Sequence, residues 1–567
     1  MIDIVRRAVP EAARALMAGA GIHPVLARVL ASRGVASSAD LRSDLAALPP
    51  FATMKGIDQA ATRLADAIAA RERIVIVADY DADGATACVV GVRGLGAMGA
   101  NVGFLVPNRF EYGYGLTPEI VAEAAAMQPR LLVTVDNGIA SHDGVEAAAA
   151  RGIDVLITDH HLPAATLPAP AIVVDPNQNG CVFPTKHLAG VGVMFYVLIA
   201  TRAALRARGH FAGGAEPNLA GLLDLVALGT VADVASLDRV NRTLVSHGLA
   251  RIRAGRARPG VLALFTVAGR DPRRATCSDL AFVAGPRLNA AGRLADMAIG
   301  IRCLLAESRE AALPLAAELD RLNHERRDVE ARMQEAALAG VEARTLDGPD
   351  TDSYTLCLYD PQWHQGVVGI VAGRLKERFH RPVVVFARGA DGELKGSGRS
   401  IAGFHLRDAL DVVAKRLPGV IAKFGGHAFA AGVTLAEHDL PRFKQAFEAL
   451  ARECLSPAHL ERILESDGPL ADAELSVELA TALGREVWGQ GFPAPLFDDA
   501  FSVIDQRVVG GDHSKLTLER GGGRYEAMLF RHSDPLPAAI HAAYRPEMHE
   551  WNGVSSLQLV VEHWRPG

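Results

Sequence analysis

The chain has 567 residues, of which 49% are hydrophobic and 22% charged, and its 59 basic and 65 acidic residues give a formal net charge of −6. This length exceeds what one hydrophobic core supports, so we expect two to four domains. No apolar run is long enough to span a bilayer, and the start of the chain, MIDIVRRAVPEAARALMAG, lacks the apolar block of a secretory signal. The net charge neither indicates nor excludes a polyanionic partner, because basic residues can line a groove while acids gather elsewhere at a metal site.

The six cysteines are dispersed along the chain and form no CxxC pair. This spacing argues against a disulfide framework or a zinc knuckle, and it favours a reducing compartment. We therefore expect a cytoplasmic protein with no membrane partner.

Short apolar runs alternate with Ala-rich helical patterns from Arg73 to Asp175. Because these runs show no polar alternation, they are typical of strands that are buried on both faces. Strands that alternate with helices predict βαβ units and a mostly parallel sheet. We expect one α/β domain over residues 73–305, preceded by a helical segment over residues 1–72. The strand runs are IVIVAD, NVGFLVPN, RLLVTVDNG, IDVLITDHH and PAIVVDPN.

Acidic and imidazole side chains follow these runs where each strand ends. Asp and Gly are ordinary turn residues, so a solvated turn is the alternative explanation for the first cluster, DYDADG. Turn composition does not predict acids and paired histidines at several strand ends, whereas the ligand crevice of a parallel sheet lies at this edge. The oxygen and nitrogen donors suit Mn²⁺ or Mg²⁺. The residues are Asp79, Asp81, Asp83, Asp136, Asn137, Asp159, His160, His161, Asp175 and Asn177.

The acids outnumber what one cation needs. Two metals about 3.5–4 Å apart can clamp a phosphate and generate hydroxide between them. Asp136, alone at its strand end, is the natural bridge, and Asp81 and Asp83 can point to the two ions. Asp233 lies in the apolar segment LLDLVALGTVADVASL, where an unpaired carboxylate costs several kcal/mol. A metal, a helix cap or a salt bridge would each explain Asp233.

Three further elements are expected toward the C-terminus. The apolar residues Leu315, Leu319, Leu322, Val329 and Met333 form one helical stripe. They predict a connector helix over residues 306–346, with a coiled-coil pairing as the alternative. The strands YTLCLYD and PVVVFAR predict a second α/β lobe over residues 347–456. The runs AFSVIDQRVV, KLTLER, YEAMLFR and SLQLVVEHW predict a small antiparallel barrel over residues 460–567.

The motifs DYDADG, VDNG, DHH and DPN, in this order, resemble the signature of the DHH phosphoesterase superfamily. GTVADV, PRLNAAGRL, WHQGVVGIVAGRL, GSGRS and FGGHAFAAG are similar to motifs of its single-stranded-DNA-specific exonucleases. The resemblance runs from near Ala78 to near Gly432, with no departure in the motifs. It implies a DHH domain, a DHH-associated (DHHA1) nucleic-acid-binding domain in the second lobe, and an OB-fold for the barrel.

The same resemblance implies roles for individual residues of the first domain. His161 would face the substrate phosphate and assist proton transfer or charge neutralisation, together with Asp79 and Asp136 as catalytic residues. For His161 the alternative is a hydrogen-bond partner that lies behind the ligands. The implied metal ligands are Asp81, Asp83, Asp136, His160 and Asp233.

Substrate contacts are implied in both lobes. Gly425 and Gly426 permit close backbone approach to a phosphate, and His427 can donate to it. Ser397 and Arg399 fit a site for the 5′ end, because arginine binds phosphate bidentately. Four further candidates could equally be surface or packing residues, namely Arg109, Tyr114, Arg287 and Asn289.

The function implied is a Mn²⁺- or Mg²⁺-dependent 5′→3′ exonuclease that degrades single-stranded DNA to mononucleotides in DNA repair, mismatch repair and recombination. Its expected partners are a single-strand-binding protein and a RecQ-type helicase, and we expect a monomer. One rival is a DHH phosphodiesterase of short oligonucleotides or cyclic dinucleotides, which would need neither the barrel nor a long groove. The other rival is a non-catalytic replication scaffold, which should have lost ligands that are all present here.

Overall fold

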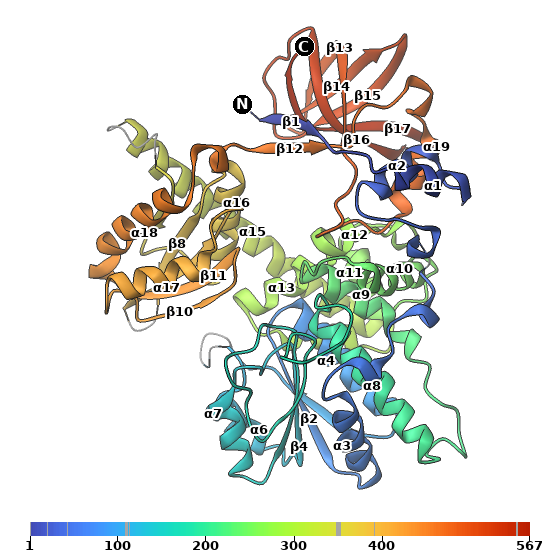
Figure 1. The fold of residues 1–567 in the computed structure, drawn as a ribbon, viewed down its shortest axis with the longest axis vertical. Coiled ribbons are helices and arrows are strands. Elements are labelled where there is room, and N and C mark those ends of the chain that lie inside the picture. Colours follow the sequence, from blue (N-terminus) through green and yellow to red (C-terminus); the bar gives the residue numbers. More distant parts are fainter. Residues whose placement is uncertain are drawn as a thin grey trace. The chain divides into compact units, whose positions relative to one another are not determined.

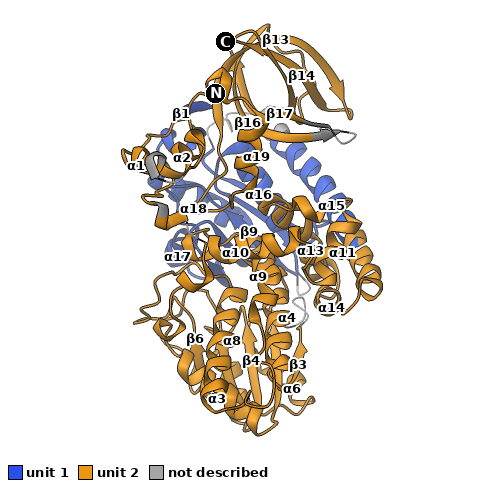
Figure 2. Cartoon of the chain, turned by 90° about the vertical axis from the view of Figure 1, so that its right-hand side faces the viewer, with its two compact units in different colours: residues 1–5, 322–464 blue, residues 6–321, 465–567 orange. Residues whose placement is uncertain are grey.

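A computed structural model describes residues 2–19, 21–41, 43–107, 112, 114–346, 353–389, 392–551 and 554–567. The chain divides into two compact units (Figure 2). Unit 1 comprises residues 1–5 and 322–464, and unit 2 comprises residues 6–321 and 465–567.

Unit 2 contains a parallel sheet of five strands in the order β3-β2-β4-β5-β6. The chain leaves β2 for one neighbour, β3, and then returns to the other side of β2 to form β4. The carboxyl ends of β2 and β4 therefore form the switch point where such sheets bind ligands. The strands are β2 (Arg73–Ala78), β3 (Asn101–Leu105), β4 (Leu131–Val135), β5 (Asp154–Thr158) and β6 (Ile172–Val174).

Helices cover both faces of this sheet (Figure 1), which explains why β2, β4 and β5 are buried along almost their whole length. The edge strand β3 is only half-buried, which differs from the prediction that every strand is buried on both faces. Val75 and Val77 face α6 (Pro118–Ala125) and α7 (His142–Ala149). The opposite face packs against α3 (Ile57–Ala69), α4 (Ala82–Ala97) and α8 (Gly190–Ala207). By length and composition α8 could cross a membrane, but 67% of it is buried inside the protein, as in a core helix.

A helical layer follows, and it ends in one long helix. The second half of this helix, α15, belongs to unit 1, where Val329 and Met333 of the predicted stripe pack against α16 (Val368–Phe379) and β8 (Val383–Arg388). The stripe is thus covered within the chain and needs no coiled-coil partner. The helices are α9 (Leu223–Ala232), α10 (Arg239–Arg253), α11 (Pro259–Val267), α12 (Cys277–Asp279), α13 (Gly285–Leu294), α14 (Ala298–Leu305) and α15 (Arg309–Leu346).

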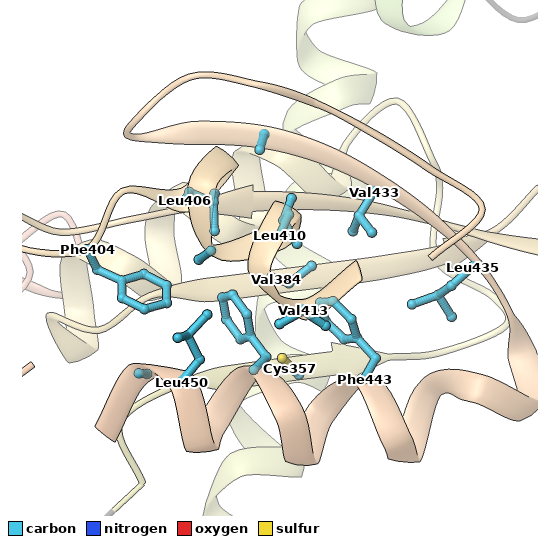
Figure 3. Packing of buried hydrophobic residues seen from close by; sticks show 14 of the residues in the cluster. Cys357, Val384, Phe404, Leu406, Leu410, Val413, Val433, Leu435, Phe443 and Leu450 are labelled. Atoms are coloured by element: carbon cyan, nitrogen blue, oxygen red, sulfur yellow. The ribbon is translucent and has the colours of Figure 1, made fainter. Parts of the chain in front are cut away.

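Unit 1 is built on a mixed sheet in the order β10-β11-β9-β8-β7, in which only β7 and β8 pair in parallel. Phe443, Leu450 and Leu410 of the covering helices pack onto Val384 (Figure 3). The elements are β7 (Leu356–Tyr359), α16 (Val368–Phe379), β8 (Val383–Arg388), β9 (Glu393–Arg399), α17 (Leu406–Arg416), β10 (Lys423–Gly426), β11 (Ala430–Ala436) and α18 (Leu440–Cys454).

The C-terminal strands of unit 2 close into a barrel in the order β13-β14-β15-β17-β16. Four of the five described strand pairs of the barrel are antiparallel, but β15 and β17 pair in parallel, so the barrel is not antiparallel throughout as predicted. Together with the parallel sheet and the second lobe, this barrel confirms the predicted fold class. The elements are α19 (Val477–Arg485), β13 (Phe497–Val509), β14 (His513–Arg520), β15 (Gly523–Leu529), β16 (Ala539–Trp551) and β17 (Val554–Pro566).

The N-terminal residues contribute more than the helices expected over residues 1–72. Besides α1 (Ala12–Gly19), α2 (Pro24–Ala31) and α3, they form a strand, β1 (Asp3–Arg6), that pairs with β12 (Ile463–Ser466). Arg33, just after α2, donates from Nη1 and Nη2 to the two carboxylate oxygens of Asp467 at 2.7 and 2.9 Å. This pair ties the N-terminal segment to the residues that lead into the barrel.

Asp467→Ala should therefore destabilise unit 2 strongly. The Arg33 and Asp467 side chains are only 2% and 1% exposed, and removing one partner of a buried pair typically costs about 3–5 kcal/mol. Glu562→Ala is the matched control, because Glu562 pairs with Arg545 on the barrel with 38% of its side chain exposed and should cost less than about 1 kcal/mol. Thermal and denaturant unfolding compare the two variants, and equal losses would contradict the structural role of Asp467.

Candidate metal centre

The structure brings together all seven residues that the sequence predicted for the metal and its chemistry. Their donor atoms form three groups, within each of which the atoms lie within 4.8 Å of one another. Asp136 and His160 each belong to two groups, so the groups form one continuous cluster. The groups are Asp79–Asp81–Asp136, Asp83–His160–Asp233 and Asp136–His160–His161.

Tight backbone geometry after β2 places the first acids. Asp81 caps α4 by accepting hydrogen bonds from the backbone N–H groups of Asp83 and Gly84 at 2.9 and 3.0 Å. A Cβ on Gly84 would lie 2.6 Å from the carbonyl oxygen of Asp79, so only glycine fits there. The DYDADG sequence therefore folds Asp79, Asp81 and Asp83 around one helix start.

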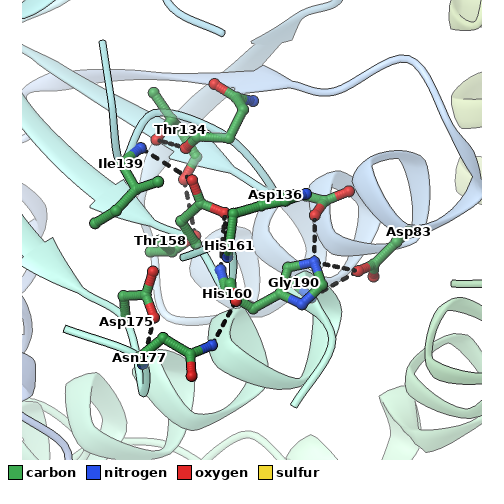
Figure 4. Close-up of polar contacts among 12 residues, drawn as sticks. Asp83, Thr134, Asp136, Ile139, Thr158, His160, His161, Asp175, Asn177 and Gly190 are labelled. Carbon is green, nitrogen blue, oxygen red and sulfur yellow. Dashed lines mark hydrogen bonds and ion pairs between the residues drawn. The ribbon is translucent and has the colours of Figure 1, made fainter. Parts of the chain in front are cut away.

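Asp136 occupies a strained backbone conformation at the end of β4. Its φ of +63° lies in the left-handed region, which is uncommon for a residue with a side chain and recurs at functional sites. The backbone N–H of Asp136 donates to the carbonyl of Thr158 at 3.0 Å, and Asn137 Nδ2 donates to the carbonyl of Val135 at 2.9 Å. These bonds hold the turn that directs Asp136 toward His160 (Figure 4).

The N-terminus of α8 binds one carboxylate and packs against another. The N–H group of Gly190 donates to Asp83 at 2.6 Å (Figure 4), and that of Val191 donates to the same carboxylate at 2.9 Å. A Cβ on Gly190 would lie 2.7 Å from the Cβ of Asp136. Helix N-termini favour negative charge. The sequence did not predict a role for Gly190. The only feature that could have indicated it is a glycine at the start of an apolar helix pattern.

The acids of the cluster oppose one another's ionisation. Burial, and then the charge of Asp81, raises the pKa of Asp83 to about 7. For Asp136 and for Asp233, burial is the largest cause and the charge of Asp83 the next, and together they raise each pKa well above its usual value. A cation removes this repulsion.

A buried oxygen of Asp136 also fits a metal ion. Asp136 Oδ1 accepts no hydrogen bond from the described residues and lies 3.0 Å from His160 Nε2. Oxygen and imidazole donors at such distances suit Mn²⁺ or Mg²⁺. The residues present therefore fit the predicted ions.

His161 is oriented by Asp159, to which sequence reasoning gave no role of its own. His161 Nδ1 lies 2.7 Å from Asp159 Oδ1, and Asp159 is fully buried. Burial alone would lower the pKa of His161, but the hydrogen bond and charge of Asp159 outweigh it and raise this pKa to about 9. The signal for Asp159 was its place as the first residue of DHH.

The DPN motif supports the other histidine. Asn177 Nδ2 donates to the carbonyl of His160 at 2.6 Å, and Asp175 Oδ1 accepts from the backbone N–H of Asn177 at 2.6 Å. Burial, and then the charge of Asp159, raises the pKa of Asp175 to about 8. Asp175 and Asn177 thus hold the strand-end backbone that carries His160.

The remaining candidates of unit 2 have varied surroundings. The hydroxyl of Tyr114 donates to the carbonyl of Asp136 at 3.0 Å and lies 3.2 Å from His161 Nδ1. Asn289 Oδ1 accepts from the N–H of Ala82 at 2.8 Å. Arg287 is buried and pairs with Asp320 at 2.7 Å. Contact of these three with DNA stays a prediction, and Arg109 lies outside the described residues.

The candidates of unit 1 gather on adjacent strands. The register of β9 and β11 places Ala430 opposite Arg399 and Gly432 opposite Ser397, and β10 ends at Gly426, whose φ is +140°. Arg399 Nη1 donates to Ser397 Oγ at 3.3 Å and to the carbonyl of Gly398 at 2.8 Å. Burial lowers the pKa of Arg399, which has no acidic partner within the described part of the chain.

A parallel sheet with five carboxylates and two histidines at its switch point, followed by a mixed-sheet lobe and a barrel, defines a DHH-type phosphoesterase. Three family models match the chain: the DHH family N-terminal domain at residues 73–230, the DHHA1 domain at 352–453 and the RecJ OB domain at 466–563. The chain belongs to the RecJ family of single-stranded-DNA-specific exonucleases.

Two relatives and one solved structure illustrate the match. The single-stranded-DNA-specific exonuclease RecJ of Dickeya dadantii is 51% identical, with 96% of each chain covered. That of Escherichia coli is 47% identical, with 100% of this chain and 99% of the relative covered. The crystal structure of RecJ in complex with Mn²⁺ from Thermus thermophilus has a TM-score of 0.82 at 32% identity, covering 100% of this chain and 79% of that one.

Without metal, the protein should lose stability as the pH rises. The pKa of Asp83 is about 7 in the folded state and 3.8 in its unperturbed state, so folding binds an extra proton between about pH 4 and 7, and this contribution disappears as the pH rises through 7. His161 acts in the same direction, because its stabilising proton is lost as the pH rises through about 9. The melting temperature in excess chelator should fall between pH 5 and pH 8, and Mn²⁺ should raise it most at pH 8.

Asp83→Asn tests this effect, since it removes one of the titrating carboxyl groups of the cluster and keeps its size. Its melting temperature in chelator should decline less than that of the parent protein over the same pH interval. An identical decline in both proteins would contradict the assignment of the pH dependence to the acidic cluster.

Proposed function

We propose that this chain degrades single-stranded DNA from the 5′ end to mononucleotides, using Mn²⁺ or Mg²⁺. The observation that carries the proposal is the cluster of five carboxylates and two histidines at the switch point of the sheet. Membership of the RecJ family accounts for the metal-dependent exonuclease activity on single strands. The polarity, the product and the roles of individual residues are our proposals.

We assign the metal ligands by their place in the cluster. Asp81, Asp83, His160 and Asp233 would hold two ions and share Asp136, because Asp136 belongs to two of the groups and its carboxylate has two oxygens. Asp79, which is grouped with Asp81 and Asp136, would lie beside these ligands as a catalytic residue. When bound, two such ions clamp a phosphate and lower the pKa of a water molecule. The N–H groups at the start of α8 fix Asp83 in place.

His161 acts as a charged donor in this proposal. In the metal-free protein, against the effect of burial, the hydrogen bond and charge of Asp159 raise the pKa of His161 to about 9. This favours the protonated imidazole, which can neutralise charge on a phosphate oxygen. Asp159 holds the ring through Nδ1. The Tyr114 hydroxyl lies 3.2 Å from Nδ1 and 3.4 Å from Nε2 of the same ring.

The barrel offers a second surface for the strand. Arg507 of β13 lies opposite Lys515 of β14 in the strand register. Lys515 forms an ion pair with Glu526 at 2.8 Å. At the end of the same strands the ring of Phe530, which is 51% exposed, packs edge-on against His513 with centroids 5.2 Å apart. Exposed rings beside cationic side chains are typical of single-strand-binding surfaces, because every base can stack.

We further propose a monomer that acts in the cytoplasm in DNA repair and recombination, together with a single-strand-binding protein and a RecQ-type helicase. All six cysteines are free thiols in the structure, which agrees with a reducing compartment. An exonuclease confined to single strands needs another activity to open duplex DNA, and this requirement supports the helicase.

Asp136→Ala should reduce turnover by about a thousandfold or more while leaving much of the DNA affinity. Without the shared carboxylate, two nearby cations repel each other and one should leave. Metal content, cleavage rate and strand affinity are measured together. Asp143→Ala, an exposed acid at the start of α7, is the control and should behave like the parent protein. An Asp136→Ala protein that keeps both metals and near-normal rate would show that the bridge is wrongly assigned.

The polarity is tested with end-labelled single strands. A 5′ label should appear as mononucleotide from the start, and a 3′ label should stay in long fragments until late. Arg399→Ala should raise KM for a 5′-phosphorylated strand about tenfold or more and change kcat little, because it removes a charge-assisted phosphate contact. Early release of the 3′ label would overturn the polarity.

A further inference from the structure

Gly369 lies directly against the two side chains that we assign to the 5′ end. It is the second residue of α16, and a Cβ at this position would lie 2.9 Å from Ser397 Oγ and 3.2 Å from Arg399 Nη2. Contacts this short require the neighbouring atoms to move. Any side chain on Gly369 would therefore displace Ser397 or Arg399.

The orientation of the Arg399 guanidinium depends on a few weak constraints. Its Nη1 is held by Ser397 Oγ and by the carbonyl of Gly398, and no acidic side chain in the described residues fixes the rest of the group. A guanidinium carries five N–H donors, so donors remain for an anion. Nη2 of the same group lies beside Gly369, since a Cβ at that position would be 3.2 Å from it.

The helix itself is held firmly. Val371 and Leu375 of α16 are buried in the core formed with β8 and the second half of α15. Glu330 of α15 accepts from Arg374 of α16 at 3.0 Å and from Arg326 at 3.1 Å. A Cβ added at Gly369 would thus move the side chains of Ser397 and Arg399 and leave the helix in place.

We propose that Gly369 is a positioning residue for recognition of the 5′-terminal phosphate. By leaving room beside Ser397 and Arg399, it keeps the guanidinium in the orientation that receives this group. The inference rests on the proposed function, which assigns the 5′ end to Ser397 and Arg399. It gives a role to the WHQGVVGIVAGRL motif, which contains no residue of the metal cluster.

Two glycines of the same helix make a matched test. Gly373 lies one turn after Gly369 in α16, and a Cβ there would meet nothing within 4 Å. Both changes replace a glycine by alanine within the same helix, so their general effect on the helix is of the same kind. Any difference between Gly369→Ala and Gly373→Ala in the full-length protein therefore reports the contact with Ser397 and Arg399.

Cleavage kinetics are measured on one single strand carrying either a 5′ phosphate or a 5′ hydroxyl. Gly369→Ala should raise KM for the phosphorylated strand about tenfold, with little change for the hydroxyl strand, in kcat, in metal content or in the melting temperature. Gly373→Ala should match the parent protein in every measurement. The inference would be overturned if Gly369→Ala raised KM equally for the phosphorylated and the hydroxyl strand. A melting temperature of Gly369→Ala below that of the parent protein would also overturn it.

Arg399→Ala, measured in parallel, separates this inference from the proposed function. If Arg399→Ala leaves the preference for a 5′ phosphate intact, the assignment of the 5′ end fails, and the role of Gly369 fails with it. If Arg399→Ala removes the preference and Gly369→Ala keeps it, only the role of Gly369 is wrong.

Discussion

Mutual repulsion among buried carboxylates is the constraint on which the first domain depends. Parallel strands end at one edge of a sheet, so acids that follow β2 and β4 must meet there. Burial and neighbouring charge raise the pKa of Asp83, Asp136 and Asp233, and the fold holds them together only through unusual local geometry. Gly84 and Gly190 leave no room for a side chain, and Asp136 adopts a positive φ. Strain of this kind persists where function requires it.

The strand-end residues of the metal cluster could be predicted from local patterns, whereas Asp233, at the end of α9, was assigned to the metal through the family resemblance. Strands buried on both faces are continuous apolar runs, and the residue after each run necessarily lies at the ligand edge of a parallel sheet. Strand β1 could not be predicted in this way, because it is short, mostly exposed and pairs with β12 more than four hundred residues away. The positioning role of Asp159 was equally hidden, because a motif does not say which of its acids holds a histidine and which faces a metal.

Two arginines show why sequence alone did not separate substrate contacts from packing. Arg287 and Arg399 both lie in motifs of the family, and both are largely removed from water. Arg287 pairs with Asp320, so its charge is balanced within the fold, whereas Arg399 has no acidic partner among the described residues. Desolvating a cation without a counter-ion is costly, so an arginine such as Arg399 is the stronger candidate for an anionic substrate. The presence or absence of that carboxylate appears only in three dimensions.

The overall charge of −6 is compatible with a polyanionic substrate for the same reason. Five of the acids are the carboxylates of the metal cluster, and two divalent cations would bring four positive charges to them. The occupied centre would then carry about one negative charge in place of five. The carboxylates thus carry much of the negative charge of the metal-free protein and repel a phosphate far less once the metals are bound, while Arg399 in unit 1 has no acidic partner among the described residues. Net charge is a poor guide to the substrate when some of the acidic residues of a protein bind its own metal cations.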